Sequence, residues 1–120
     1  MTPARSAPEM VRHVLTVRCS DEPGIVAAVS QTIFSHGANI TDSAQYAHER
    51  SQTFTLRMEI DVPAGAETRF DADLRDELAR FDPVLSLRRL SELRRVVIMV
   101  STADHCLWDL LYHWQAGDLP

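Results

Sequence analysis

Residues 21–25 read Asp-Glu-Pro-Gly-Ile, and one helix length further along the chain residues 37–40 read Gly-Ala-Asn-Ile. Pro23 has a φ close to the helical value and no N–H to leave unpaired, which favours a strand that turns into a helix at this point. Gly37 is typical of the residue that follows the last turn of a helix. The two stretches therefore predict the corners at which one helix begins and ends.

The same two corners form the candidate ligand site. Gly24 lets a ligand approach the backbone, and the first amides of the helix, which lack internal partners and carry the positive end of its dipole, suit a carboxylate. We predict that both corners face one small ligand. The residues concerned are Asp21, Pro23, Gly24, Ile25, Asn39 and Ile40.

Structural roles for these residues stay open beside the functional ones. Asp21 equally suits the cap of the helix that follows it. Asn39 equally suits the turn into the next strand, because asparagine tolerates tight backbone geometry. A proline or a glycine taken alone more often only marks the beginning or the end of a helix or strand.

Outward from the corners, apolar residues recur with two different periods. Alternation over residues 11–19, 53–60 and 84–90, and more weakly over 40–46, predicts four strands, with a turn at 48–52. Helical spacing predicts a helix from Pro23 to His36 and a second one later in the chain. The apolar positions are Ile25, Val26, Val29, Ile33 and Phe34 in the first helix, and Phe70, Leu74, Leu78 and Phe81 in the second.

The order strand, helix, strand, strand, helix, strand predicts an α+β fold of the split βαβ, ferredoxin-like type, with both helices on one face of the sheet. We expect this domain to span residues 11–91 after a disordered lead at 1–10. The pattern changes at Arg94, since residues 96–100 are apolar without alternation, as in a parallel strand covered on both faces. Apolar residues at helical spacing up to Gly117 then predict a crossover helix. Residues 92–120 are therefore expected to begin a larger α/β domain.

Composition excludes several classes of function. The formal net charge of −5 argues against a nucleic-acid surface, and the longest apolar run is far too short to cross a bilayer, so neither kind of partner is expected. All twelve basic residues are arginine, which excludes a lysine nucleophile within the chain. Cys19 and Cys106 are too isolated for a disulfide framework, which favours a reducing, cytoplasmic location.

A second cluster of reactive residue types lies at the start of the last predicted helix. Asp104, His105 and Cys106 resemble a nucleophile with its base, but neighbours on a helix point about 100° apart, so a capped helix start is the favoured interpretation. His105, Asp109 and His113 share one face, yet no further well-spaced ligand completes a metal site, and a polar helix face explains them. No metal is expected.

Residues 19–26 and 37–40 together resemble the ACT domain, a regulatory module that binds small molecules. Beyond it, residues 95–101, 104–107, 109–112 and 117–119 resemble the junction at which the ACT domain of formyltetrahydrofolate deformylases meets their Rossmann-like formyltransferase domain. The resemblance covers residues 11–120. In related formyltransferases that act on a phosphorylated amine, a glycine-rich phosphate loop follows the first strand of this domain. Here that place holds residues 101–106, with Ser101, His105 and Cys106 and without glycine. This difference suits an enzyme that uses water as co-substrate.

This resemblance implies hydrolysis of 10-formyltetrahydrofolate to tetrahydrofolate and formate, for one-carbon balance and purine biosynthesis. It also implies control by an amino acid such as methionine or glycine, and homo-oligomers built partly through ACT sheets. Folate is the substrate, and no cofactor is implied. The family's catalytic Asn, His and Asp would lie beyond Pro120, so the chain has no catalytic residue of its own and should be inactive alone. The alternative is a stand-alone ACT module that binds amino acids.

Overall fold

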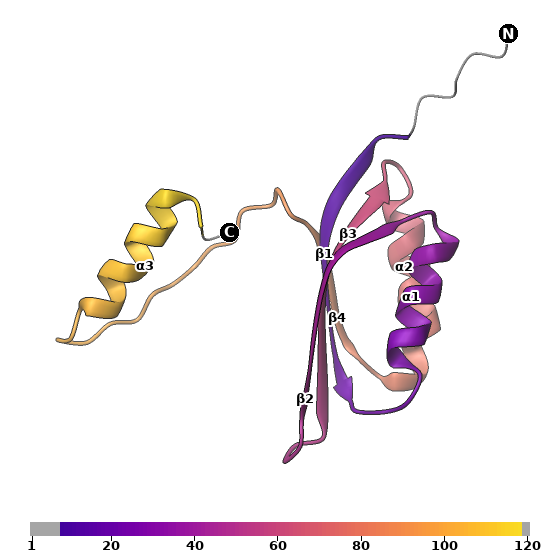
Figure 1. Ribbon diagram of the computed structural model, residues 1–120, viewed down its shortest axis with the longest axis horizontal. Coiled ribbons are helices and arrows are strands. Elements are labelled where there is room, and N and C mark those ends of the chain that lie inside the picture. Colours follow the sequence, from indigo (N-terminus) through magenta and orange to yellow (C-terminus); the bar gives the residue numbers. More distant parts are fainter. Residues whose placement is uncertain (1–7, 119–120) are drawn as a thin grey trace, which may run out of the picture. The chain divides into compact units, whose positions relative to one another are not determined.

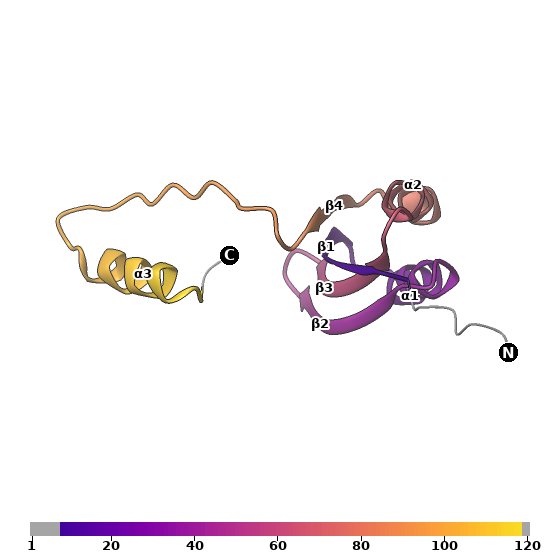
Figure 2. The same cartoon turned by 90° about the horizontal axis from the view of Figure 1, so that it is seen from above.

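The computed structural model describes residues 8–118, in which four antiparallel strands form a sheet with the order β2-β3-β1-β4. Two helices, α1 and α2, lie side by side on one face of the sheet (Figures 1 and 2). The predicted ferredoxin-like α+β fold is confirmed. The bounds are β1 Met10–Ser20, α1 Ile25–Ser35, β2 Asn39–His48, β3 Thr53–Pro63, α2 Glu67–Leu78, the 3-10 turn η1 Ala79–Phe81, and β4 Val84–Arg89.

The hydrophobic core fills the space between the helices and the sheet. β1 lies in the middle of the sheet and pairs with both β3 and β4, so its alternate residues Leu15 and Val17 are completely buried. Their cross-strand partners on β3, Met58 and Leu56, are buried as well. The inward face predicted for β3 is confirmed.

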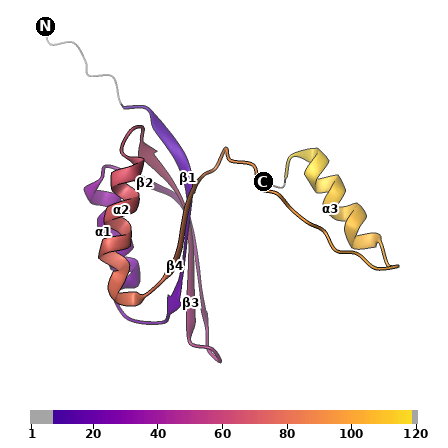
Figure 3. The same ribbon diagram turned by 180° about the vertical axis from the view of Figure 1, so that it is seen from behind.

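Helix α2 packs on the sheet through the row of apolar residues predicted for it. Phe70, Leu74 and Leu78 have no exposed surface, and Phe81 in η1 is 7% exposed. The view from behind shows the same antiparallel packing of α1 against α2 over the strands (Figure 3). Burial of such side chains contributes roughly 1.5–3 kcal/mol each, which explains why the helix forms where the stripe lies.

Helix α1 departs from the prediction at its start. Gly24 has a φ of 95° and forms the N-cap, so the helix begins at Ile25 and Pro23 lies in the preceding turn. The expectation that Pro23 stands in the first helical turn is wrong, because a left-handed residue interrupts the helical run after it. Val26 and Phe34 are also not core residues, since they are 39% and 79% exposed on the flank of α1.

Strand β2 is longer than predicted and forms one edge of the sheet. It pairs only with β3, in the antiparallel arrangement expected, with a register shift between Ile40 and Asp42. Every residue of β2 is exposed. Its residues on the helix side, such as Ser43 and Gln45, are polar and are not covered by α1, which explains the weak sequence pattern.

The chain divides between Arg89 and Leu90 into two compact units. Within the second unit, residues 93–101 have no regular structure, and α3 spans His105–Ala116. The predicted helix is confirmed, whereas the predicted strand at 96–100 is wrong for the described chain. A parallel strand needs a hydrogen-bonding neighbour, and residues 8–118 provide none there.

Two expectations concern the ends of the first domain. Met10 begins β1, and the carbonyl of Glu9 accepts a hydrogen bond from the amide of Ala64 (2.8 Å), so the expected disordered lead does not extend to residue 10. The other residues of the expected lead, residues 1–7, lie outside the described residues.

No helix in the described range has the length and apolar character needed to span a membrane.

Substitution of Leu74 by Asp tests the core. Leu74 is fully buried in α2, so an aspartate there would bury an unpaired charge and lower the free energy of unfolding by more than about 4 kcal/mol. Ala72→Asp, at an exposed position of the same helix, should cost less than about 1 kcal/mol. Thermal melting by circular dichroism measures both, and an unchanged melting temperature in Leu74→Asp would contradict the packing of α2.

Candidate functional site

The first corner joins β1 to α1. The amide of Asp21 donates to the carbonyl of Gln52 (2.8 Å), which ties the corner to the β2–β3 turn. Gly24 accepts the first helical hydrogen bond, from the amide of Ala28 (2.9 Å). No side chain caps α1, so the interpretation of Asp21 as its cap is wrong. The amides of the first helical turn therefore remain available to a ligand.

Arg80 lies beside this corner, although its sequence context did not mark it as a site residue. A Cβ atom built on Gly24 would lie 3.2 Å from Nη2 of Arg80, so the guanidinium sits directly against the glycine backbone. The same guanidinium stacks 4.4 Å from the centre of the Phe81 ring, which fixes its position. Because the approach depends on how η1 packs against the corner, no local motif signals it.

Acidic groups give the first corner a mixed electrostatic character. Burial raises the pKa of the Cys19 thiol at the end of β1, and the carboxylates of Glu22 and Asp21 raise it further. Arg80 and the dipole of α1 add positive charge at the same corner. A corner with both signs of charge fits a zwitterionic ligand better than a simple anion.

The second corner, residues 36–40, follows α1. Gly37 has a φ of 68°, and the amides of Gly37 and Ala38 donate to the carbonyls of Phe34 and Ile33 (both 3.1 Å). These two bonds are the Schellman arrangement that ends a helix, so the predicted stop at Gly37 is confirmed. Asn39 then begins β2, and Ile40 is 37% exposed.

His36 anchors this second corner to α2, a role that sequence reasoning missed. Its Nε2 lies 2.8 Å from Oδ2 of Asp73, and its Nδ1 lies 2.9 Å from the carbonyl oxygen of Thr32. The imidazole also meets the Phe70 ring edge to face, with centroids 5.4 Å apart. The sequence signal for such an anchor is a histidine directly after the last residue of a helix.

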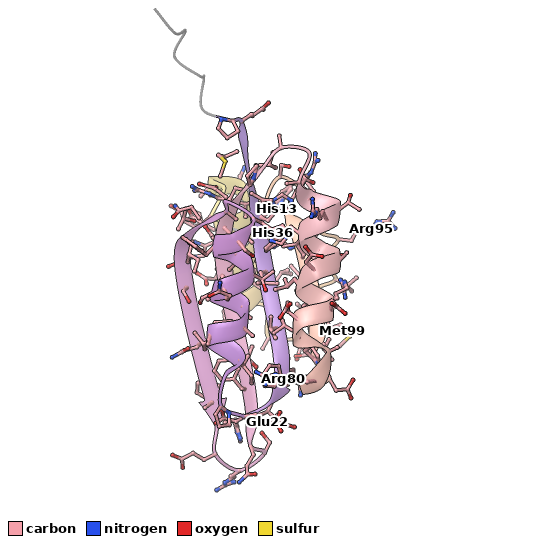
Figure 4. The ribbon with its side chains drawn as sticks, turned by 90° about the vertical axis from the view of Figure 1, so that its right-hand side faces the viewer. His13, Glu22, His36, Arg80, Arg95 and Met99 are labelled. Carbon is pink, nitrogen blue, oxygen red and sulfur yellow. The ribbon has the colours of Figure 1, made fainter. Side chains whose placement is uncertain are left out.

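The two corners lie at opposite ends of α1. Figure 4 shows Glu22 and Arg80 at one end of the helix pair and His36 with His13 at the other. The 11 residues of α1 span about 16 Å, which exceeds the length of a free amino acid. Within one chain the structure therefore does not bring Asp21, Pro23, Gly24 and Ile25 together with Asn39 and Ile40.

Near the second corner, a charged network ties β4 to α2. Both carboxylate oxygens of Glu67 accept hydrogen bonds from Arg89, with Nε 3.0 Å from Oε2 and Nη2 2.9 Å from each oxygen. Oε2 also lies 3.4 Å from Nε2 of buried His13. Partial burial alone would raise the pKa of Glu67, but the contacts with Arg89 and His13 outweigh it and lower that pKa. Glu67 is thus held as a carboxylate at the start of α2.

The candidate residues of the second unit do not form a reactive site in the described chain. Ser101 lies outside regular structure, and Cys106 is exposed at the start of α3. His105 is the first residue of α3 and is also exposed. Asp104 precedes α3, but its carboxylate accepts from the Trp108 indole (3.2 Å) instead of capping the helix. The expected side-chain cap is therefore wrong.

Metal-ligating side chains are dispersed over the described residues. His113 lies 3.7 Å from Asp109 and 3.1 Å from Asp118, while His105 is not part of this group. Across residues 8–118 no group of three or more histidine, cysteine or acidic residues is arranged to hold a metal ion.

Residues 13–75 match the ACT domain family, and together with the sheet order and the two corners they show that the chain belongs to this family. The similarity extends further along the chain, to formyltetrahydrofolate deformylases. The deformylase of Bacillus subtilis (strain 168) is 44% identical over 108 residues, which are 88% of this chain and 36% of that protein. The deformylase of Corynebacterium sp. (strain P-1) is 39% identical over 116 residues.

A solved structure shows the same relationship. The crystal structure of a formyltetrahydrofolate deformylase from Pseudomonas putida KT2440 superposes with a TM-score of 0.75 at 33% identity, and covers 90% of this chain and 39% of that one. The chain thus spans 36–40% of the length of these two curated relatives. The predicted resemblance is confirmed.

Removal of the Glu67 charge should lower the melting temperature by an amount that depends on pH. Because the folded chain lowers the pKa of Glu67, its stabilising contribution is fully present above the ordinary pKa of a free glutamate and is lost as the pH falls through the lowered value. Glu67→Gln should therefore lower the melting temperature near neutral pH, and the difference from the native chain should shrink in acid. The control is Glu77→Gln, at an exposed position of α2. A difference that persists unchanged in acid would contradict the assigned role.

Proposed function

We propose that this chain is the amino-acid-sensing and oligomerisation part of a formyltetrahydrofolate deformylase, acting in the cytoplasm. The observation that carries the proposal is the first corner, with its open helix N-terminus and its fixed guanidinium, in a chain similar to deformylases over 88% of its length. The whole enzyme would hydrolyse 10-formyltetrahydrofolate to tetrahydrofolate and formate, for one-carbon balance and purine biosynthesis.

In this proposal the first corner binds a free amino acid by both of its charges. The carboxylate accepts hydrogen bonds from the first amides of α1 and from Arg80, and the ammonium group meets Asp21. Gly24 keeps the backbone accessible, while Pro23 and Ile25 shape the corner. Methionine and glycine are the effectors that the resemblance favours.

Asn39 and Ile40 belong to the same ligand only if a second copy supplies them. Because the corners lie at opposite ends of α1, an antiparallel arrangement of two α1 helices would bring the first corner of one chain to the second corner of the other. The exposed edge of β2 offers the backbone groups for such a pairing. We propose this homodimer as the state that binds the effector.

The second unit is proposed to begin the catalytic domain. Its apolar stretch is highly exposed in the described chain, with Val97 86% and Met99 92% exposed, and α3 buries none of its residues. Such a segment needs a larger α/β domain to cover it. Ser101, His105 and Cys106 would then form a loop of that domain.

The alternative function is a stand-alone ACT module that senses an amino acid without a catalytic domain. The sequence encoded after Pro120 separates the two proposals. A continuing α/β domain with an Asn, His and Asp constellation supports the deformylase, and a stop codon directly after Pro120 supports the module.

Calorimetry with free amino acids tests the sensing proposal. Titration with methionine and with glycine should give saturable heat for one of them, and Arg80→Gln should weaken that binding about tenfold or more, because a charge-assisted hydrogen bond is lost. Arg69→Gln removes an exposed arginine of α2 far from the corner in sequence and should leave the affinity unchanged. Absence of saturable heat with every amino acid would leave the ACT domain without a sensing role.

A formate-release assay tests the division of labour. The 120-residue chain should release no formate from 10-formyltetrahydrofolate above the uncatalysed rate, because the proposed catalytic residues lie outside it. Measurable turnover by the purified chain, lost on Cys106→Ser or His105→Gln, would instead place chemistry at the start of α3.

A further inference from the structure

His36, the residue directly after α1, lies between two oxygen atoms that can only accept hydrogen bonds. Its Nδ1 is 2.9 Å from the carbonyl oxygen of Thr32, and its Nε2 is 2.8 Å from Oδ2 of Asp73. A neutral imidazole carries one N–H, so it can donate to one of these oxygens and must turn a lone pair toward the other. The imidazolium carries an N–H on each nitrogen and therefore satisfies both contacts.

His48, at the end of β2, shows the opposite arrangement. Its Nδ1 accepts a hydrogen bond from the backbone amide of Ser51, at 3.3 Å. A backbone amide only donates, so this nitrogen carries a lone pair and the ring is neutral. The contacts of His36 and of His48 therefore require different protonation states within one domain.

The surroundings of His36 favour its charged form. A groove runs between α1 and α2, and of the described residues that line it, Asp73, Asp76 and Glu77 are acidic and His36 is the one basic group. His36 also follows the last turn of α1, where the negative end of the helix dipole stabilises a cation. On its other side the ring meets Phe70, which carries no charge.

The other charged groups at this end of the helix pair bind one another. Figure 4 shows His13 of β1 at the same end as His36. Nε2 of His13 lies 3.4 Å from Glu67, whose carboxylate is bound by Arg89 of β4. Glu67 precedes Asp73 by six residues, which places it about 120° away around the axis of α2. This network therefore acts on another flank of α2, and Asp73 remains the carboxylate that meets His36.

We propose that His36 is protonated in the folded chain and that its imidazolium forms a pH-sensitive latch between α1 and α2. Loss of the proton as the pH rises leaves a lone pair against Thr32 or Asp73 and removes the attraction to the carboxylate. The amides of Gly37 and Ala38 close the end of α1 next to this contact, so its release loosens the second corner. The latch is a property of the folded domain and does not depend on whether the chain senses an amino acid.

Long-range 1H–15N correlation spectra of the histidine rings test the latch on the native chain. At about pH 7.5, roughly one unit above the pKa of a free histidine, His36 should show protons on both ring nitrogens. His48 should show a neutral ring with its proton on Nε2. A neutral ring at His36 at this pH overturns the proposal.

Thermal melting of His36→Gln tests whether the proton stabilises the fold. A proton that the folded chain binds more tightly than the unfolded chain stabilises the fold at low pH, and this contribution is lost as the pH rises. The native chain should therefore melt above His36→Gln at about pH 6, and the difference should shrink by about pH 8. Asp73→Asn should show the same trend. The matched controls His48→Gln and Asp76→Asn, the latter in the same groove, should not.

Hydrogen exchange locates the effect at the second corner. Between about pH 6 and about pH 8 the protection factors of the Gly37 and Ala38 amides should fall about tenfold in the native chain and stay constant in His36→Gln. Far-UV circular dichroism establishes that each variant is folded, and Asp73→Asn replaces His36→Gln if the latter unfolds. Protection that does not change in the native chain, or a melting difference that is independent of pH, overturns the latch.

Discussion

Burial of one face of the sheet beneath α1 and α2 is the constraint on which the rest of the structure depends. The central strand β1 has neighbours on both sides, so Leu15 and Val17 are shielded by strands laterally and by helices above. The stripe of α2, from Phe70 to Leu78, closes the same layer. Because this layer holds most of the apolar surface, the loops at its two ends are free to take irregular geometry.

The corners of α1 show how that freedom is used. Gly24 takes a left-handed conformation that no other residue adopts without strain, and this turns the chain so that Arg80 lies against it. At the other end Gly37 ends the helix, while His36 reaches Asp73. Each corner is therefore held by contacts from α2 or η1, and a ligand at either corner would act on the packing between the two helices.

The sequence predicted the fold well because periodicity reports burial directly. Alternation in β1 and β3 and the stripe in α2 exist only because one face of each element is covered. The same logic explains the errors. Residues 96–100 have the composition of a covered strand, but composition does not provide the neighbouring strand, and the described chain leaves them exposed. Val26 and Phe34 likewise have apolar side chains, yet they remain 39% and 79% exposed in the described chain.

The candidate site could be predicted only in part, because the two corners that flank α1 in the sequence lie at its opposite ends in the structure. Proline and glycine marked the turns correctly, yet the length of α1 separates them within one chain, and Arg80 entered the first corner through packing that no local pattern encodes. One ligand could therefore contact both corners, as proposed, only if a second copy supplied the second corner. The β2 edge and residues 96–100 are two further exposed parts of the described chain. The proposed function depends on what covers these two exposed parts, because the buried layer beneath α1 and α2 contributes nothing to either of them.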